Sequence, residues 1–181
     1  IDGTGTVVWE IDTAIVDPIL KVDGNYILIA EKGINKICLY IDNKLQYDVD
    51  DPDTVMSAEL SSNGDVVVVT DKSSYRGGIS VYNKSGEQIF SWASGSDAVI
   101  CADISAASRS VAVALLNSDV TAKTTVQLFN VNETESYAKI EMPDTVVYEL
   151  QFVGDKVNAF GDNRVTGISS SGKIVYDNDF S

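Results

Sequence analysis

Short runs of β-branched and apolar residues, separated by turns that contain glycine, recur along the whole chain. The clearest stretch is residues 60–90, which holds the valine run 66–69 between a turn at Asn63-Gly64 and a later turn at 84–86. Asn-Gly supplies the positive φ that tight hairpin turns need, and valine fits a buried, pleated sheet. The pattern predicts a four-stranded antiparallel meander over this stretch.

The same pattern appears four times. The turn glycine Gly64 has counterparts at Gly24 and Gly154, and residues 108–115 hold the equivalent place without a glycine. Each predicted third strand ends on a bulky residue, and both markers recur about every 40 to 47 residues. This period is typical of propeller blades of four strands, and a helical solenoid is excluded because no window shows a 3.6-residue period.

We therefore predict an all-β fold, either a β-propeller or a partial propeller of about four blades, each a four-stranded antiparallel meander. Residues 1–181 form one domain in this interpretation. The predicted blades are residues 15–49, 55–92, 99–140 and 146–177.

Residues 5–11 resemble a fifth outer strand that has no blade of its own. Closed rings usually have more than four blades, so we expect the chain to be part of a longer propeller; the alternative is that residues 5–11 pair elsewhere, across a subunit interface. An open arc leaves blade faces exposed. The sequence thus predicts either flanking blades or self-association through those faces.

The composition limits the classes of partner that the chain can bind. The chain of 181 residues is 44% hydrophobic, which is enough for a core, and its formal net charge is −14 with only 13 Lys and Arg. Binding to nucleic acid needs clustered basic side chains that neutralise phosphates, so nucleic acid is an unsuitable partner. The same argument applies to an anionic lipid surface. A basic protein or peptide is compatible with this charge.

The chain contains no histidine, which removes the commonest general base and most zinc sites. Its two cysteines, Cys38 and Cys101, lie in strand-like runs and belong to no CxxC pattern. A free cysteine in such a run behaves as a small apolar residue. We therefore predict no catalytic residue, no cofactor-binding residue, no metal ligand and no cofactor for this chain.

Three carboxylates occupy equivalent predicted positions on the inner strands of three blades. Counting back five residues from each turn position gives Glu59 and Glu149, with Asp103 in the third blade and Ile19 in the first. Inner strands line the central channel of a propeller, so Glu59, Asp103 and Glu149 could form a partial acidic collar that holds a cation or a basic peptide. The alternative is that they accept backbone hydrogen bonds or face solvent.

The acidic loop that contains Asp48, Asp50, Asp51 and Asp53 is the best metal candidate by composition alone. An EF-hand loop requires glycine at its sixth position, and here that position is Asp53, so the match fails. We interpret this loop as a solvated acidic turn. Aromatic residues recur at repeat positions and are interpreted as packing between blades; they are Trp9, Tyr40, Tyr47, Tyr82, Phe90, Trp92, Phe129 and Tyr176.

Four segments resemble a known family: Trp9 with residues 22–26, 33–37 and 152–163, including Phe160-Gly161-Asp162-Asn163. They look like a group of uncharacterised Firmicute proteins, known only as a domain of unknown function and similar to propellers of the WD-repeat and quinoprotein-like kind. The resemblance implies an N-terminal membrane anchor that this chain lacks, and a propeller outside the membrane that is longer than this chain. It carries over no catalytic residue, and the Gly-His and Trp-Asp dipeptides of WD repeats are missing.

Together these observations predict a non-catalytic binding or scaffold propeller that contacts a protein or peptide outside the cytoplasm. The alternative is a ligand-binding, metal-binding or enzymatic propeller whose site is completed by blades that are absent from this chain. Convergence of Glu59, Asp103 and Glu149 around one point would favour the alternative, and divergence into solvent would disfavour it.

Overall fold

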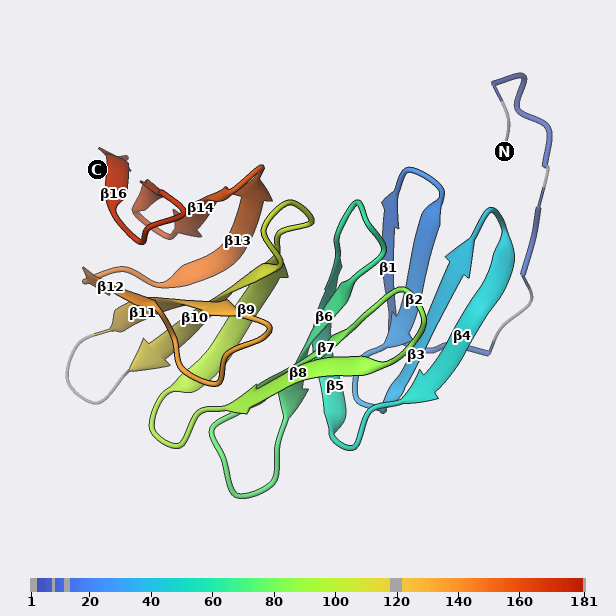
Figure 1. The fold of residues 1–181 in the computed structure, drawn as a ribbon, viewed down its shortest axis with the longest axis horizontal. Helices are drawn as coiled ribbons and strands as arrows, with labels where there is room; N and C mark the ends of the chain where they lie inside the picture. Colours follow the sequence, from blue (N-terminus) through green and yellow to red (C-terminus); the bar gives the residue numbers. More distant parts are fainter. Residues whose placement is uncertain (1–2, 8, 12–13, 118–121, 181) are drawn as a thin grey trace.

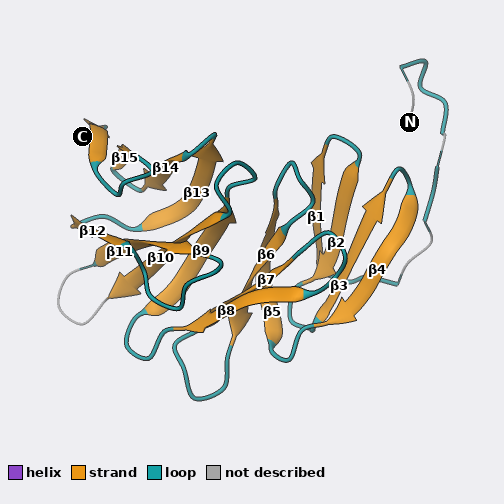
Figure 2. Cartoon of the chain, viewed as in Figure 1, coloured by secondary structure: helices purple, strands orange, loops and turns teal. Residues whose placement is uncertain are grey.

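Four antiparallel sheets, each of four strands in sequence order, follow one another in a computed structural model that describes residues 3–7, 9–11, 14–117 and 122–180. Each sheet is a meander, as predicted, and no helix occurs in these residues (Figure 2). The first two blades are formed by β1 (Pro18–Asp23), β2 (Tyr26–Glu31), β3 (Lys36–Ile41) and β4 (Lys44–Asp50), then β5 (Thr54–Leu60), β6 (Val66–Asp71), β7 (Gly78–Tyr82) and β8 (Gln88–Ala93). The last two are formed by β9 (Ala98–Ile104), β10 (Ser110–Asn117), β11 (Lys123–Asn130) and β12 (Ala138–Pro143), then β13 (Val147–Val153), β14 (Lys156–Gly161), β15 (Arg164–Ile168) and β16 (Ile174–Asp179).

The blades are arranged as an open arc. Figure 1 shows the first blade at one end of the molecule and the fourth at the other, with blades two and three between them. This arrangement is the propeller architecture that the 40-to-47-residue repeat predicted.

The valine run of β6 is buried on both sides because it lies between two seams of the arc. Val66 and Val68 pack toward blade one, whereas Val67 and Val69 pack toward blade three. All four are at most 4% exposed. A strand covered on both faces needs a continuous apolar run, which is why the sequence here does not alternate.

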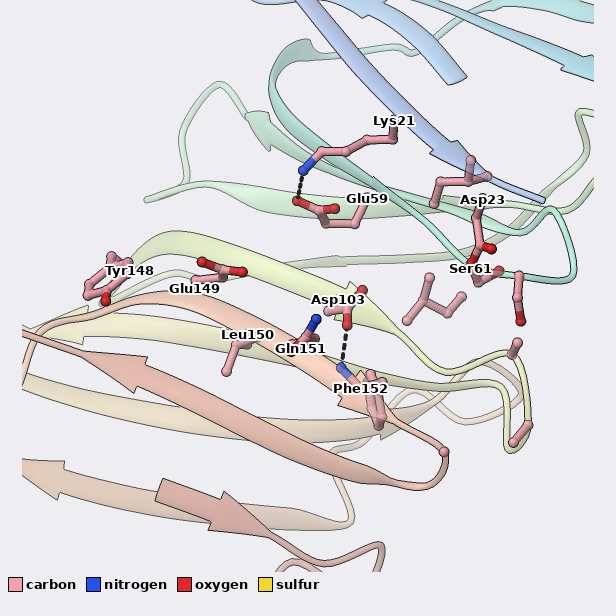
Figure 3. Close-up of a pocket in the computed structure, with 16 residues that line it drawn as sticks. Lys21, Asp23, Glu59, Ser61, Asp103, Tyr148, Glu149, Leu150, Gln151 and Phe152 are labelled. Atoms are coloured by element: carbon pink, nitrogen blue, oxygen red, sulfur yellow. Dashed lines mark hydrogen bonds and ion pairs between the residues drawn. The ribbon is translucent and has the colours of Figure 1, made fainter. Parts of the chain in front are cut away.

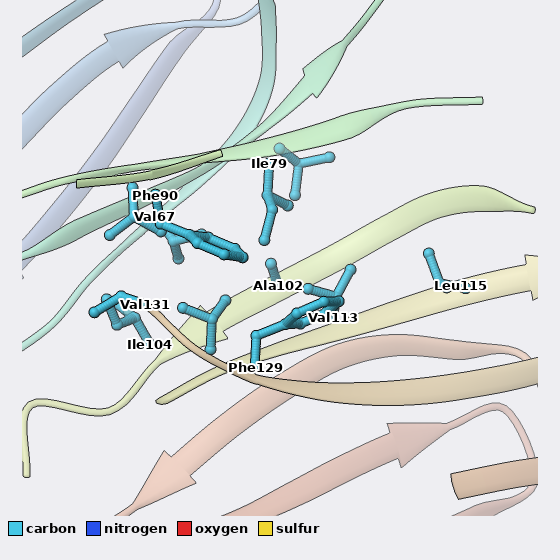
Figure 4. Packing of buried hydrophobic residues seen from close by; sticks show 12 residues of the cluster. Val67, Ile79, Phe90, Ala102, Ile104, Val113, Leu115, Phe129 and Val131 are labelled. Carbon is cyan, nitrogen blue, oxygen red and sulfur yellow. The ribbon is translucent and has the colours of Figure 1, made fainter. Parts of the chain in front are cut away.

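Three hydrophobic clusters fill the three seams between neighbouring blades. The seam between blades two and three contains the largest fully buried side chain, Phe129, whose ring centroid lies 5.1 Å from that of Trp92 and 5.7 Å from that of Phe90. Figure 4 shows Phe129 and Phe90 within this cluster. These aromatic contacts confirm the predicted packing role for this trio. Tyr47 and Tyr82 similarly pack in the seam between blades one and two.

The outer faces of the two end blades have no neighbouring blade. On blade one this face carries Leu20, Val22, Ile29, Cys38 and Tyr40, which alternate along their strands with residues packed toward blade two. We call this surface the blade-one face. Tyr40 contacts the ring of Trp9 at a centroid distance of 5.4 Å, so these two aromatics do not lie in a seam between blades.

On blade four the outer face carries Val153, Asn158, Phe160, Val165 and Tyr176, which alternate with residues packed toward blade three. The ring of Tyr176 lies over Gly167, where an added Cβ would come within 2.1 Å of it, and its hydroxyl donates to Asn158 Oδ1 at 2.7 Å. We call this surface the blade-four face. Tyr176 therefore also lies outside the seams.

The prediction of an outer strand at residues 5–11 is wrong for the residues that the structure describes: 5–7 and 9–11 belong to no strand, and residue 8 lies outside them. An outer strand pairs with the third strand of a blade. The four third strands β3, β7, β11 and β15 are each paired on both sides already, so none can accept a fifth outer strand.

Candidate binding groove on the inner strands

A groove of about 720 Å³ runs across the inner strands of all four blades. It is lined from β1, β5, β9 and β13, together with the turns that follow the last three of these strands. Figure 3 shows its labelled side chains gathering from the four strands around one hollow. The predicted carboxylates Glu59, Asp103 and Glu149 all line it, with Asp23 as a fourth.

Two of these carboxylates already have partners within the chain. Lys21 Nζ lies 2.6 Å from Glu59 Oε1, and these side chains are about one-third exposed or slightly more. Asp103 Oδ2 accepts the backbone N–H of Phe152 at 2.6 Å, which joins β9 to β13 across the seam (Figure 3). Backbone hydrogen bonding was one of the alternatives that the sequence left open, and it applies to Asp103.

Asp103 is partly buried, and its surroundings favour the neutral acid. Burial, with a smaller contribution from the nearby charge of Glu59, raises the pKa of this carboxyl to about 6. The backbone N–H groups of Phe152 and Ile104 act in the opposite direction, because they stabilise the carboxylate. The group therefore titrates close to neutral pH.

Cys101 lies beside the same carboxylates on β9. Burial, with smaller contributions from the charges of Glu149, Glu59 and Asp103, raises the pKa of its thiol to about 12. A thiol with such a pKa stays protonated at neutral pH and is a poor nucleophile. The structure thus places Cys101 as a structural side chain.

Counting from the turn glycine does not preserve the register between blades. The last facing pairs of the inner hairpins are Asp23/Tyr26, Ser61/Asp65, Ser105/Ser110 and Val153/Lys156. The turns between them are residues 24–25, 62–64, 106–109 and 154–155, so their lengths differ. Along each inner strand, the residue two positions before this pair lies at the same level in every blade. These residues are Lys21, Glu59, Asp103 and Gln151.

The prediction that Glu149 lies level with Glu59 and Asp103 is therefore wrong, and so is the placing of Ile19 in blade one. Gln151 and Lys21 occupy those places. Glu149 is two residues further from the turn along β13, and Figure 3 shows it beside Tyr148, away from Asp103. The physical reason is the shorter two-residue turn of blades one and four, which moves the count along the strand.

Sequence reasoning missed Lys21 and Gln151 as groove residues. Pairing outward from each hairpin end, rather than counting back from one glycine, would have found both. A lysine at the level of the acidic side chains changes the electrostatics of the groove, because it neutralises one of four negative charges.

No group of three or more Cys, Asp or Glu side chains suited to a metal ion occurs in the described part of the chain. In the acidic loop, three of the carboxylates already have partners within the chain. Asp48 pairs with Lys36 at 2.8 Å, and Asp53 pairs with Lys72 at 2.9 Å. Asp51 is 1% exposed and accepts the Tyr82 hydroxyl at 2.7 Å and the Asp53 N–H at 2.8 Å.

Those partners come from separate parts of the chain, because Lys36 lies on β3, Lys72 directly follows β6 and Tyr82 lies on β7. Asp51 in particular fixes the connection between blades one and two rather than binding an ion. This is a structural role that composition could not indicate.

The solved structures with the same fold include chains that are longer than this one and a chain of nearly the same length. BamB from Moraxella catarrhalis is 14% identical, with a TM-score of 0.61 over 98% of this chain and 54% of that chain. BBS1N, solved in complex with ARL6DN, is 14% identical, with a TM-score of 0.53 over 84% of this chain and 48% of that chain. The computationally designed protein Ika4 is 14% identical, with a TM-score of 0.61 over 98% of this chain and 99% of that chain.

At these identities the likeness shows the fold alone. The chain spans about half the length of BamB and BBS1N and nearly the whole length of Ika4. No curated protein matches the sequence. The described residues contain no helix that is long and apolar enough to span a membrane.

A protein-family model described as a family of unknown function, DUF5711, matches residues 1–180. The match confirms the predicted resemblance to a domain of unknown function. The Firmicute origin and the membrane anchor that the resemblance implied stay predictions.

Proposed function

The chain belongs to DUF5711, a family of unknown function, and for this member we propose a non-catalytic propeller module that binds a basic segment of another protein in the inner-strand groove. One observation carries the proposal. The groove is lined by four carboxylates, those of Asp23, Glu59, Asp103 and Glu149, and by a single cation, Lys21, which is already paired.

Electrostatics supports a cationic ligand in this position. The side chains of one sign gather in a hollow with protein on several sides, which focuses the field and attracts a ligand of opposite charge. The formal net charge of −14 acts over a longer range in the same direction. Complementary charge of this kind increases the association rate and excludes acidic partners.

The dimensions of the groove support a peptide rather than a single ion. Its volume of about 720 Å³ lies within the range of small-molecule and peptide pockets, and its lining extends over four strands. Glu59 is held by Lys21, and Asp103 is held by the backbone N–H of Phe152. Because each carboxylate is held by a different partner, the negative groups are spread along the groove instead of converging on one point. A chain with several Lys or Arg side chains would match this spacing.

The proposal that the module is not an enzyme rests on the side chains that could act as a general base or a nucleophile. The chain contains no histidine, and the thiol of Cys101, on the strand that carries Asp103, is held protonated by its raised pKa. The complex of BBS1N with ARL6DN supports a protein partner for the fold in general. The extracytoplasmic location is part of the proposal and rests on the family resemblance.

The test is fluorescence anisotropy of a labelled ten-residue peptide rich in Lys and Arg, titrated with the protein at low salt. We expect saturable binding that weakens as ionic strength rises, and none with an acidic peptide of equal length. The Glu149→Gln variant should weaken binding roughly two- to fivefold, because it removes one groove charge. Its matched control is Glu133→Gln, on the β11–β12 turn outside the groove.

Equal affinity for the basic and acidic peptides would overturn the proposal. Equal weakening by Glu149→Gln and Glu133→Gln would show that net charge, not the groove, attracts the peptide, and would also overturn it.

A further inference from the structure

The two end faces of the arc are built like the faces that its interior buries. In the seam between blades one and two, strands β2 and β3 present Leu28, Ala30, Ile37 and Leu39 to blade two, all at most 2% exposed. The opposite side of the same strands presents Ile29, Cys38 and Tyr40, which are only partly buried. Strands β2 and β3 of the end blade therefore carry apolar side chains on both faces.

Exposed apolar residues lie on both of these ends. On blade one, Leu20 and Val22 are 60% and 63% exposed. On blade four, Val153 is 59% exposed and Tyr176 is 40% exposed. Exposed apolar surface on a face that has no neighbouring blade is typical of an interaction site.

The curvature of the arc indicates what covers the faces. The four blades superpose on about half of two longer propeller chains, 54% of BamB and 48% of the computationally designed Ika8. An arc that occupies half of a ring needs the same arc again, rotated by a half-turn, to close the ring. A second copy of this chain, related by a two-fold axis, supplies that arc.

We propose that two copies of this chain close into one ring, with the blade-four face of each copy packed on the blade-one face of the other. The two contacts are equivalent by symmetry, and together they cover all four end faces. A head-to-tail contact that closes in this way gives a discrete dimer rather than a fibre. The proposal is independent of peptide binding in the groove.

The area is sufficient for a stable dimer. Four strands spaced about 4.8 Å apart, with about six residues of 3.3 Å each, give a face of roughly 380 Å². Two contacts with two faces each bury roughly 1,500 Å², which matches a standard specific interface of about 1,600 Å².

The N-terminal segment that contains Trp9, Ile11 and Ile15 lies where the partner would bind when the two copies close into a ring. Trp9 stacks edge-on against Tyr40, and Ile11 and Ile15 line a small apolar pocket with Cys38 on the blade-one face. They occupy part of the surface that the blade-four face of the partner would cover. Dimerisation in this proposal displaces the segment, so the segment competes with the partner for the blade-one face.

Sedimentation of the 181-residue chain from about 1 to 100 µM tests the assembly. We expect a species of twice the 19.5 kDa chain mass that dissociates on dilution. A monomer at every concentration overturns the proposal, as does a trimer or an open series of oligomers. A monomer that buries its end faces against a different protein would overturn it as well, because the occupant would not be a second copy.

Two face variants test the contact itself. Leu20→Lys and Val153→Glu change exposed residues, so each variant should fold normally yet shift dimer dissociation at least tenfold. Mixing them restores dimers, since one contact in the mixed dimer is unaltered and the other pairs a lysine face with a glutamate face. Tyr75→Lys, on a blade-two hairpin at 51% exposure, is the control and should leave the dimer unchanged.

Failure of the mixture to form more dimer than either variant alone would overturn the pairing of these two faces. The Trp9→Ala variant tests the competition: we expect tighter dimerisation and, in the dimer, slower maleimide labelling of Cys38 than in the monomer. Weaker dimerisation of Trp9→Ala would show that the segment belongs to the interface, and would overturn the displacement step.

Discussion

The seam between blades two and three and the outermost strand of blade four are made from similar residues in opposite situations. In the seam, Val67 and Phe129 are each 1% exposed, and the side chains around them interlock from two sheets. On β16, Val175 and Ile174 are 52% and 51% exposed. The difference shows that position in the arc, rather than hydrophobicity of the strand, decides which apolar residues stabilise the fold.

The seam should therefore respond most strongly to truncation. Phe129→Ala removes the ring that contacts Phe90 and Trp92 and leaves a cavity between two sheets, so we expect a loss of about 3–5 kcal/mol in the free energy of unfolding. Urea unfolding monitored by tryptophan fluorescence measures it. A loss below 1 kcal/mol would mean that the seam does not hold blades two and three together.

A pair of turn glycines sharpens the comparison between an interior and an end position. Gly64 has φ +84°, and an added Cβ would come within 2.6 Å of Tyr26 Cε1 on the neighbouring blade. Gly24 has φ +59° and no atom within 4 Å of the added Cβ. We expect Gly64→Ala to destabilise by about 3 kcal/mol and Gly24→Ala by about 1 kcal/mol, the second from backbone strain alone.

The melting temperatures of the two variants would test this order. Equal shifts would show that Tyr26 moves aside at no cost and that the contact between blades at this turn is loose.

Asp103 reports on the seam between blades three and four through its titration. Its pKa rises from an ordinary 3.8 to about 6 mainly because β13 buries it. Between about pH 4 and 6 the unfolded chain has released this proton and the folded chain retains it, so stability falls as pH rises through that window. Asn cannot ionise, and its amide oxygen can still accept the Phe152 N–H, so we expect Asp103→Asn to remove a decrease of roughly 3 kcal/mol.

The measurement is urea unfolding of both proteins from pH 3.5 to 8. Asp155→Asn, in an exposed turn of blade four, is the control and should keep the wild-type pH dependence. Parallel pH profiles for wild type and Asp103→Asn would show that blade four does not cover the carboxyl in solution.

The smallest effect is expected on the outermost strand of blade four. Ile174→Ser on β16 removes a half-exposed side chain and creates no cavity, so the free energy of unfolding should change by less than about 0.5 kcal/mol. The unfolding measurement is made at a dilution where the protein is monomeric. A loss above 2 kcal/mol would mean that this surface is buried even in a single chain.

Much of the fold could be predicted because the repeat is local. The valine run 66–69 and the glycine turns specify strands and hairpins within a few residues of each position, and the four sheets occur where the 40-to-47-residue period indicated. The strand expected at residues 5–11 failed for a non-local reason. Strand formation needs an unpaired neighbour, and every third strand already had its partner.

The groove was predicted only in outline. Glu59, Asp103 and Glu149 were correctly assigned to the inner strands, but the level of each depends on turn lengths that differ between blades, and Lys21 and Gln151 were missed. The buried Asp51–Tyr82 hydrogen bond joins residues 31 positions apart, and an acidic loop read by composition gives no sign of it.

The sequence by itself determined the strands, the repeat, the number of blades and the strongly acidic charge, because these follow from backbone preferences and side-chain chemistry over short distances. The tertiary structure alone decided which valines are buried, which carboxylate has a pKa near 6, and that one lysine stands among the acids of the groove. Those properties depend on how neighbouring blades are stacked and in what register, and burial and charge interactions act through space rather than along the chain.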